Sequence, residues 1–304
     1  MGLKKIGIRR GVQRYQCNDC KKKFQSKRRP NKLPEIIFKK YILRRQTLNN
    51  LAQDYDRSIP WIRAKIFDYE PPELTFNPRP VVIVCDATFY GKRKDKLGTL
   101  VFKDISSNEI LIWKHIQTET VEDYKQLLHY LLFLGYTVNA IITDGFKGLH
   151  KAFKDYPIQL CQFHQRKTIN RYLTQNPKLD IAIDLQKIMR KLTKTTEEKF
   201  IKKLDVWYEK YKDTLLEKSI NPTTDKASYT HPKVVSAYKS IRRNIPYLFT
   251  YQKYTDFKID NTTNAIDGGV FSPMKKLMNI HTGFNKSLKL KIVDFYLVYY
   301  HKKS

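Results

Sequence analysis

Two aspartates stand at the ends of apolar, β-branched runs and are the residues best placed to do chemistry. Asp86 ends the run 81–86, and Asp144 follows the run 138–143. Runs of this composition predict buried strands, and a carboxylate at the end of a buried strand is costly without a partner or a metal. Two such carboxylates on neighbouring strands would bind hard divalent cations such as Mg²⁺ or Mn²⁺. We therefore expect a metal-dependent site containing Asp86 and Asp144.

The charge of the chain indicates the substrate class. Fifty-eight Lys and Arg residues face 29 Asp and Glu among 304 residues, which gives a net charge of +29. The excess is spread along the whole chain and predicts an extended electrostatic footprint on nucleic acid. The alternative is a solvated basic surface. Combined with the acidic pair, the charge favours phosphodiester chemistry on nucleic acid, and the 41% hydrophobic content supports folded cores.

Membrane and secretory signals are missing from the sequence. It has no apolar run of the roughly 18 residues that a membrane span needs, and residues 1–16 contain no stretch typical of a signal peptide. We expect no membrane partner and a cytoplasmic location. The four cysteines are then reduced thiols or metal ligands rather than a disulfide framework.

The elements that position the two acids form a recognisable α/β order. The patterning predicts three strands, over 81–87, 98–103 and 110–117, with a polar turn at 91–96. A helix capped by Thr120 and Asp123 should follow and run to Leu134. After it we expect a strand over 137–143, a short helix over 145–155, a strand over 158–161 and a further helix. This order matches the ribonuclease-H-like fold, in which the first and fourth strands lie side by side. That adjacency would bring Asp86 and Asp144 to one pair of metal ions.

A cysteine pair near the N-terminus resembles half of a zinc ribbon. Cys17 and Cys20 lie in the stretch 13–24, which reads as a zinc-binding knuckle. Structural zinc needs four ligands, and no Cys or His precedes this pair. A segment upstream of Met1, or pairing between two subunits, would supply the other two ligands. The alternative is a turn without metal.

Two short helices with a tight turn between them follow a break at Pro30 and Pro34. A first amphipathic helix is expected over 35–45, and the helices around 47–55 and 58–66 fit a helix-turn-helix. Ser58 is a good N-cap for the second of these, and Pro60 is tolerated only in a first turn. The candidate DNA contacts are Arg57, Trp61, Arg63 and Lys65. The alternative is an ordinary helical hairpin.

The remaining patterns divide the chain. The expected parts are a zinc-ribbon-like segment over 1–30, a helix-turn-helix region over 31–70, a proline-rich linker over 71–80, the first part of the catalytic core over 81–175, a helical insertion over 176–255, and a completion of the core over 256–304. Within the insertion, Thr195 and Glu198 predict a capping box for a helix with an apolar stripe over 200–215. A loop is expected from Asn221-Pro222 to His231-Pro232, and a helix over 233–250.

Four motifs in a fixed order resemble the bacterial insertion-sequence transposases of the Mutator-like group. They are Asp86 in "CDATF", Asp144 in "TDG", Cys161 and His164 in "CQFH", and Asp267 in "NAIDG", with His281-Thr282-Gly283 following. The resemblance covers nearly the whole chain. It implies a DNA transposase whose partners are double-stranded DNA, at terminal inverted repeats and at the target, and a second copy of the chain. It also implies association with the bacterial nucleoid.

The resemblance makes Asp267 the third member of an acidic triad. Asp86 would bridge two metal ions, Asp144 would hold one and Asp267 the other, so that the ions clamp the attacking and leaving oxygens of an in-line displacement. The freed 3′-hydroxyl would then attack target DNA. The alternative is that all three acids pair with Lys or Arg. The family's third acid is usually Glu, one methylene longer than Asp267.

Two other functions are considered, because the third acid is Asp267 instead of Glu and because Cys17 and Cys20 supply only half of the ligands of a zinc ribbon. One alternative is a catalytically inactive, transposase-derived protein that binds the element's ends through residues 1–66. Another is a structure-specific nuclease with the same ribonuclease-H-like fold. An exchange of Asp267 for Glu, and a strand-transfer assay, would separate these from a transposase.

Two further features carry paired interpretations. Cys161 and His164 could form a zinc pair by residue type, and the resemblance places them near the active site, where they order the site or contact DNA. The alternative is a buried thiol and a hydrogen-bonded imidazole. Trp207 would, by the resemblance, stack on a distorted base near the cleavage point. Its place in the 200–215 apolar stripe favours helix packing instead.

Overall fold

Residues 2–9, 11–25, 31–91, 95–220, 225–280 and 285–301 are described by the computed structural model of the chain. The chain divides into an N-terminal unit, residues 1–70, and a C-terminal unit, residues 71–304. The division falls at the first proline of the stretch expected to be a linker. Four of the features discussed above lie wholly or partly outside the described residues: Pro30, the middle of the polar turn at 92–94, Asn221-Pro222, and His281-Thr282-Gly283.

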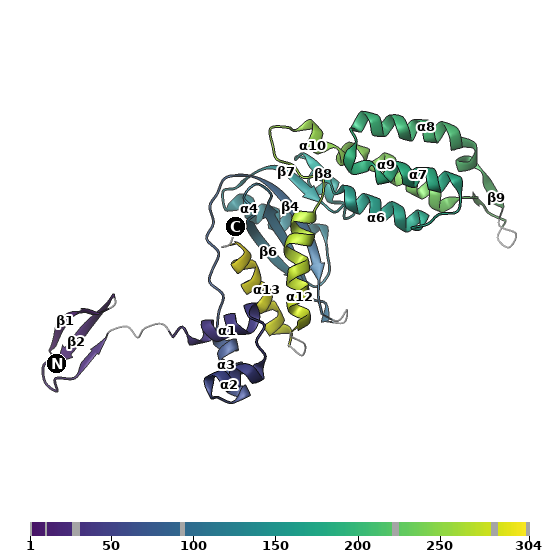
Figure 1. The fold of residues 1–304 in the computed structure, drawn as a ribbon. Helices are drawn as coiled ribbons and strands as arrows, with labels where there is room; N and C mark the ends of the chain where they lie inside the picture. The colour runs from purple at the N-terminus through teal and green to yellow at the C-terminus, as the bar shows by residue number, and fades with distance from the viewer. Residues whose placement is uncertain are drawn as a thin grey trace. The chain divides into compact units, whose positions relative to one another are not determined.

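The N-terminal unit begins with a small antiparallel sheet that the sequence did not predict. Its strands are β1 (Leu3–Arg9), β2 (Val12–Cys17) and β3 (Lys23–Gln25), in the order β1-β2-β3. They are the purple arrows of Figure 1. Cys17 is the last residue of β2, and Cys20 lies in the turn before β3. The cysteine pair therefore lies on a β-hairpin turn.

Three helices follow in the same unit, α1 (Leu33–Leu43), α2 (Leu48–Tyr55) and α3 (Ile59–Asp68). Ser58 is the N-cap of α3, as expected, and its hydroxyl accepts a hydrogen bond of 3.4 Å from the N–H of Trp61. Phe38, Leu51 and Ile62 are completely buried and provide the small core on which the three helices pack. The two helices of the expected helix-turn-helix are thus present, joined by a turn in which Asp56 is left-handed.

A mixed five-stranded sheet is the centre of the C-terminal unit, and this confirms the α/β class. Its strands are β4 (Pro80–Phe89), β5 (Gly98–Asp104), β6 (Ile110–Ile116), β7 (Thr137–Thr143) and β8 (Ile158–Leu160), in the order β6-β5-β4-β7-β8. The first three pair antiparallel, whereas β7 is parallel to β4 and β8 to β7. The expected adjacency of the first and fourth strands is therefore observed.

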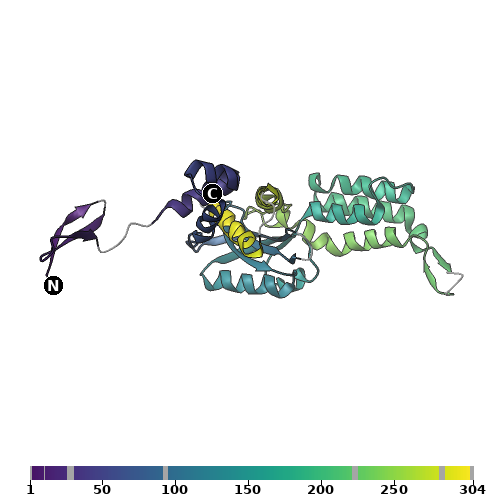
Figure 2. The ribbon, with the colours of Figure 1, turned by 90° about the horizontal axis from the view of Figure 1, so that it is seen from below.

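Helices cover both faces of this sheet (Figure 2). On one face lies α4 (Val121–Phe133), capped as expected by Thr120, whose hydroxyl accepts a hydrogen bond of 3.2 Å from the N–H of Asp123. Tyr124 and Leu131 of α4 are completely buried against the strands. On the other face lies α13 (Lys286–His301), whose Asp294 accepts hydrogen bonds of 2.7 and 2.8 Å from Trp113 and His115 of β6.

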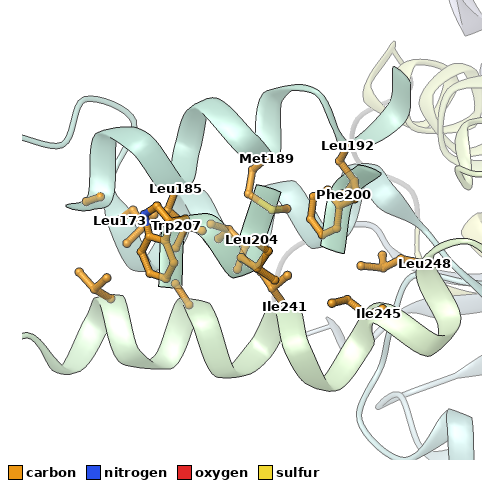
Figure 3. Packing of buried hydrophobic residues seen from close by; sticks show 14 of the residues in the cluster. Leu173, Leu185, Met189, Leu192, Phe200, Leu204, Trp207, Ile241, Ile245 and Leu248 are labelled. Atoms are coloured by element: carbon orange, nitrogen blue, oxygen red, sulfur yellow. The ribbon is translucent and has the colours of Figure 1, made fainter. Parts of the chain in front are cut away.

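The insertion after β8 is a helical bundle with its own core (Figure 3). Its elements are α6 (Gln162–Leu173), α7 (Asp180–Arg190), η2 (Leu192–Lys194), α8 (Glu197–Leu216), the hairpin strands β9 (Lys218–Ile220) and β10 (Ala227–Tyr229), and α9 (Pro232–Leu248). The hairpin was expected to be a loop, whose residues 221–224 lie outside the described chain. The N-cap of α8 is Thr196 rather than Thr195, because the side chain of Thr196 accepts from the N–H of Lys199.

Buried amides fasten the end of the insertion to the sheet. Gln159 of β8 and Gln162 of α6 both donate to the carbonyl oxygen of Leu248, over 3.0 and 2.8 Å. Thr250, which begins α10 (Thr250–Lys253), donates to the carbonyl oxygen of Ile158. The chain thus leaves the insertion beside the strand from which it departed. It then forms α11 (Asn264–Ile266), the π-helical segment η3 (Asp267–Phe271) and α12 (Ser272–Ile280).

The short helix after β7 is shorter than the sequence predicted. Residues 145–155 were expected to be helical, but α5 spans only Leu149–Ala152. Gly145 and Gly148 have φ values of +93° and +99°, a backbone conformation that an α-helix does not contain. The stretch 145–148 is therefore a loop. No helix within the described ranges combines the length and the apolar content that crossing a membrane requires.

Candidate active site

Asp86 lies on the second half of β4, beside the point where β7 ends. In the parallel ladder Cys85 pairs with Thr143, and the next residue on each chain segment is an aspartate. Asp86 is only 6% exposed, and its Oδ1 accepts a hydrogen bond of 2.7 Å from the N–H of Ala87. The strand register therefore brings Asp86 and Asp144 to the same edge of the sheet.

A tight turn after β7 holds Asp144. Its Oδ1 accepts a hydrogen bond of 2.8 Å from the N–H of Phe146, which is the geometry of an Asx-turn. Gly145 between them has a left-handed backbone, and a Cβ added there would lie 2.8 Å from Cδ1 of Leu160. The Asp-Gly pair after the strand thus satisfies both the turn and the close approach to β8.

Asp267 follows the insertion in the sequence and lies in the helical segment that begins with α11. It is the first residue of η3, and π-helical turns are frequent at functional sites. The hydroxyl of Thr263 donates a hydrogen bond of 2.8 Å to its Oδ2. Lys103 of β5, which is 1% exposed, donates from Nζ to the carbonyl oxygen of Ala265 over 2.9 Å. The buried lysine fastens the segment carrying Asp267 to the sheet.

The three carboxyl groups interact electrostatically. Burial raises the pKa of Asp86 well above its ordinary range, and the charges of Asp144 and Asp267 raise it further. Burial also raises the pKa of Asp144, and Asp267 adds to this effect, against the opposing influence of the Phe146 N–H and of His164. Among the described residues, no Lys or Arg forms an ion pair with any of the three acids. The alternative interpretation, in which all three aspartates pair with Lys or Arg, therefore does not describe this structure.

The donor chemistry of the cluster suits a hard divalent cation. Carboxylate oxygens are the ligands that Mg²⁺ and Mn²⁺ prefer, and three interacting carboxylates with no Lys or Arg partner among the described residues leave negative charge that a cation would neutralise. Asp86, Asp144 and Asp267 are the residues that could hold it. Within the described part of the chain, however, no three His, Cys, Asp or Glu side chains already converge in a metal-holding geometry.

Cys161 and His164 lie next to this cluster and share a buried threonine with it. The backbone N–H of Thr263 donates to Cys161 Sγ over 3.3 Å. The Thr263 hydroxyl lies 3.3 Å from His164 Nδ1, and His164 Nε2 lies 4.0 Å from Asp267 Oδ2. The two motif residues and the third acid are therefore joined through one side chain.

The pKa values of this thiol and imidazole are shifted in opposite directions. Burial raises the pKa of Cys161, but hydrogen bonds with His164 and Thr263 outweigh that effect and lower the pKa overall. The pKa of His164 is raised, first by its hydrogen bond with Cys161, although burial opposes the rise. This is the hydrogen-bonded arrangement that the sequence left as one of two interpretations.

Three residues at the site were not singled out from the sequence. Glu119 accepts a hydrogen bond of 2.6 Å from the Tyr124 hydroxyl, and its pKa is raised by burial and by the charge of Asp144. Lys103 and Thr263 are the other two. Thr263 precedes Asp267 by four residues, a spacing that makes neighbours on a helix, so it was discoverable. Glu119 and Lys103 carry no signal in a single sequence.

The candidate DNA contacts of the N-terminal unit lie around one exposed helix. Trp61 is half-buried, with Arg57 Cζ at 5.7 Å and Lys65 Nζ at 5.8 Å from its ring centroid, which are cation–π distances. Lys65 is also paired with Asp68 at 2.6 Å. Arg57 and Arg63 are exposed. These two arginines are therefore the better placed of the four to reach a phosphate or a base.

Cys17 and Cys20 turn toward one another at the end of the hairpin. The pKa of the Cys17 thiol is lowered by hydrogen bonds from the backbone N–H groups of Cys20 and Asp19 and from the Cys20 thiol. The turn brings two thiols together, half the number of ligands that a structural zinc site needs. Within the described chain, no third His, Cys, Asp or Glu joins the pair.

Trp207 is part of the insertion's core, and its assignment as a DNA contact needs correction. The residue is 3% exposed, and its indole N–H donates a hydrogen bond of 3.0 Å to the carbonyl oxygen of Ile181 (Figure 3). Both the ring and its polar atom are already engaged, so stacking on a base would require the bundle to open. Helix packing, the interpretation that the apolar stripe favoured, is what the structure contains.

Comparison with known proteins gives no relative on which to base a function. No protein-family model matches the chain, and none of the curated proteins matches it.

Proposed function

We propose that this chain is a DNA transposase that cuts phosphodiester bonds at the ends of a mobile element and joins them to target DNA. The observation that carries the proposal is the electrostatic interaction of Asp86, Asp144 and Asp267, none of which pairs with a Lys or Arg among the described residues, in a chain of net charge +29. Their positions are those of the acidic triad in the Mutator-like insertion-sequence transposases that the motifs resemble.

The architecture supports the same proposal. The strand order β6-β5-β4-β7-β8, with two antiparallel and two parallel pairings, is the order expected of a ribonuclease-H-like core. The first acid lies on the central strand, the second after the neighbouring strand, and the third on a helical segment that follows the insertion. We therefore propose a ribonuclease-H-like core interrupted by a helical insertion.

In the proposed reaction, Asp86, Asp144 and Asp267 would hold one or two Mg²⁺ or Mn²⁺ ions. Such ions, when bound, neutralise charge on the phosphate and activate the attacking and leaving oxygens of an in-line displacement. The protein's own contribution is positional. Thr263 fixes Asp267 through its hydroxyl, Lys103 fastens the backbone of the same segment, and the Ala87 and Phe146 N–H groups orient the other two carboxylates.

The N-terminal unit is proposed to recognise the ends of the element. Arg57 and Arg63 would contact DNA from α3 and the turn that precedes it. Cys17 and Cys20 would contribute two thiolates to a zinc site completed by a second subunit. Because joining two element ends requires two protein copies, we propose that the chain acts as a dimer on DNA.

Cleavage of the element's own ends tests the proposal. Sequencing of the genomic DNA on both sides of the reading frame would reveal inverted repeats, which supply the substrate. We expect the purified chain to nick these ends with Mg²⁺ or Mn²⁺ and to transfer them to a target plasmid, and the Asp86→Asn variant to bind but not cut. Metal-independent cutting, or full activity of that variant, would refute the proposed site.

The same assay separates the competing functions. Nicking without strand transfer would indicate a structure-specific nuclease. Binding without cutting by the wild type, with cutting restored in Asp267→Glu, would indicate a decayed transposase whose third acid is one methylene too short. Binding without cutting by both proteins would indicate a DNA-binding protein that retains only the fold.

A further inference from the structure

A pocket lies beside the candidate active site, between the loop after β7 and helix α9 of the insertion. Its volume is about 440 Å³, within the range of about 300–1,000 Å³ typical of ligand pockets. The lining residues come from three places: Thr143 and the stretch 145–151 around α5, Ile158 and Leu160 of β8, and Arg243, Asn244 and Tyr247 of α9. The sheet and the insertion therefore build it together.

Three cationic side chains and a histidine line the pocket, and none of the described lining residues is an acid. Lys147, His150, Lys151 and Arg243 line it, all four are exposed, and no Asp or Glu is among the described residues that line it. None of the four forms an ion pair with an acid elsewhere in the described chain, although many other lysines of this protein do. Cations gathered around a hollow without counter-charges fit an anionic ligand.

An aromatic side chain forms part of the same wall. Tyr247 is half-buried and pairs with the His150 ring at a centroid distance of 5.7 Å. Asn244, also on α9, is fixed by a hydrogen bond of 2.7 Å to Gln165 and adds a polar group. Positive charge beside an aromatic face is the combination that binds a nucleotide, with its phosphate on the cations and its base on the ring.

The pocket adjoins the acid cluster through the chain itself. Thr143 and Gly145 both line it, and Asp144 lies between them, with each neighbouring Cα about 3.8 Å away. The left-handed backbones of Gly145 and Gly148 fold this loop along the pocket wall. The pocket therefore lies along the loop that carries Asp144, although none of the three acids lines it.

We propose that this pocket is a subsite for one nucleotide of a single DNA strand next to the phosphodiester that is cut. A hollow of this size admits a nucleotide but not a duplex. The inference rests on the proposed function, because it takes the acids as the position of the scissile phosphate. It adds to that function a region of separated strands at the cleavage point, with α9 contributing from the insertion.

Binding of a fluorescein-labelled oligothymidylate, followed by anisotropy in EDTA, tests the subsite without any cutting. We expect Arg243→Gln and Lys151→Gln each to weaken binding about fivefold or more beyond their matched controls. The controls are Arg190→Gln on α7 and Lys154→Gln just after α5. Both replace an exposed cation that does not line the pocket, so each pair of variants has the same net charge.

The aromatic contact has its own matched pair. Tyr247→Phe keeps the ring and should bind like the wild type, whereas Tyr247→Leu should lose about fivefold or more, the effect of removing one stacked base. Because Tyr247 also packs against both cores of the unit, thermal unfolding of the variants shows whether each remains folded. An oligonucleotide with 4-thiothymidine should crosslink to the peptides containing 145–151 and 243–247.

The results of these binding and crosslinking experiments distinguish failure of the proposed nucleotide subsite from failure of the proposed transposase function. Equal losses in pocket variants and controls, with crosslinks elsewhere, would overturn the subsite even if the wild type cuts element ends. Selective losses in the pocket variants would support it even if no cutting is found, in which case only the transposase proposal fails. Free thymidine monophosphate that competes as well as the oligonucleotide would overturn the assignment to a DNA strand.

Discussion

The carboxylate cluster is a place where the fold holds like charges together at a cost. Asp86 is almost fully buried, and besides this burial the charges of Asp144 and Asp267 disfavour its ionisation. Each unit by which a pKa is raised costs the ionised state about 1.4 kcal/mol. The folded protein therefore bears this cost at neutral pH unless a cation is bound.

Asp86→Asn should accordingly stabilise the metal-free protein. The pKa of Asp86 is raised in the folded state, so the stabilising contribution of its protonated form is complete below the ordinary pKa of about 3.8. That contribution is lost as the pH rises through the folded-state pKa. We expect the variant and the wild type to be similar in stability near about pH 4. At pH 7 the variant should be more stable by about 1 kcal/mol or more.

Urea unfolding in EDTA across this pH range measures the difference. Asp144→Asn should change stability in the same direction, because the pKa of Asp144 is also raised. Addition of Mn²⁺ should raise the stability of the wild type and much less that of Asp86→Asn, since binding to the native state stabilises it. A variant no more stable than the wild type at pH 7 would contradict the picture of repelling carboxylates.

Thr263 is the residue through which the motif pair acts on the third acid. Thr263→Val keeps the shape of the side chain but removes the hydroxyl that donates to Asp267. We expect a loss of about 1 kcal/mol in stability. The rate of metal-dependent nicking should fall about tenfold to a hundredfold, because a carboxylate displaced by about 1 Å holds its substrate poorly.

Thr263→Ser is the matched control, since it retains the hydroxyl. It should keep the nicking rate within a few-fold of the wild type, whereas a purely structural role for Thr263 would make the two variants equally active once their stabilities are allowed for. Rates measured at saturating DNA separate misplacement of Asp267 from weakened binding.

At the scale of the elements, the patterns of the core strands and helices were readable from the sequence. The five strands and the cap at Thr120 follow from alternating or continuous apolar runs and from side-chain capping. Sequence patterns gave the wrong residue where two neighbouring side chains are equally suited to cap a helix. Thr195 and Thr196 can both cap a helix, and burial of Phe200 and Leu204 selects the register. The stretch 145–148 is a loop and not the expected helix, because Gly145 and Gly148 have positive φ values.

Only some residues of the candidate active site could be predicted from the sequence, and the reason differs from that for the elements. Asp86 and Asp144 carry a signal because a strand-end carboxylate is unusual. Lys103 joins the site through a hydrogen bond to Ala265, 162 residues later in the sequence, and Glu119 joins it through its electrostatic interaction with Asp144, 25 residues later. Trp207 shows the reverse case, since an aromatic residue of an expected DNA-binding insertion belongs to its core.

Trp207 should therefore act on stability. Trp207→Ala removes a buried ring and leaves the Ile181 carbonyl without its donor, and we expect a loss of about 3–5 kcal/mol. Trp207→Phe should cost less, because it keeps most of the buried surface. Thermal unfolding measures both. If Trp207→Phe weakens DNA binding while leaving stability unchanged, the ring contacts DNA after all.

Helix α3 should contribute to DNA affinity through Arg63. The residue is exposed and α3 is capped independently by Ser58, so Arg63→Gln should leave the unfolding transition unchanged. If the arginine contacts a phosphate, the slope of log affinity against log salt should decrease by about 0.9. Arg44→Gln, at an exposed position after α1, is the control. Equal slopes for the two variants would remove Arg63 from the interface.

At the scale of the whole molecule, the division at Glu70 and Pro71 predicts two units that fold separately. Glu73 lies in the exposed, proline-rich stretch at the start of the C-terminal unit, and a glutamate-specific protease should cut after it before cutting at folded positions. We expect the fragment 74–304 to keep the Mn²⁺-dependent stabilisation of the intact chain. Unfolding of that fragment after the cut would show that the units depend on one another.

The fastening of the insertion's end beside β8 has a consequence for the newborn protein. Ribosomes add about 5–20 residues per second, so Asp86 and Asp144 emerge on the order of ten seconds before Asp267. The third acid reaches them only after the whole insertion has been made and its last turn has closed on Gln159 and Gln162. Unfinished or truncated chains therefore carry two acids of the three, and under the proposed function such a nascent polypeptide would be unable to cut its own gene.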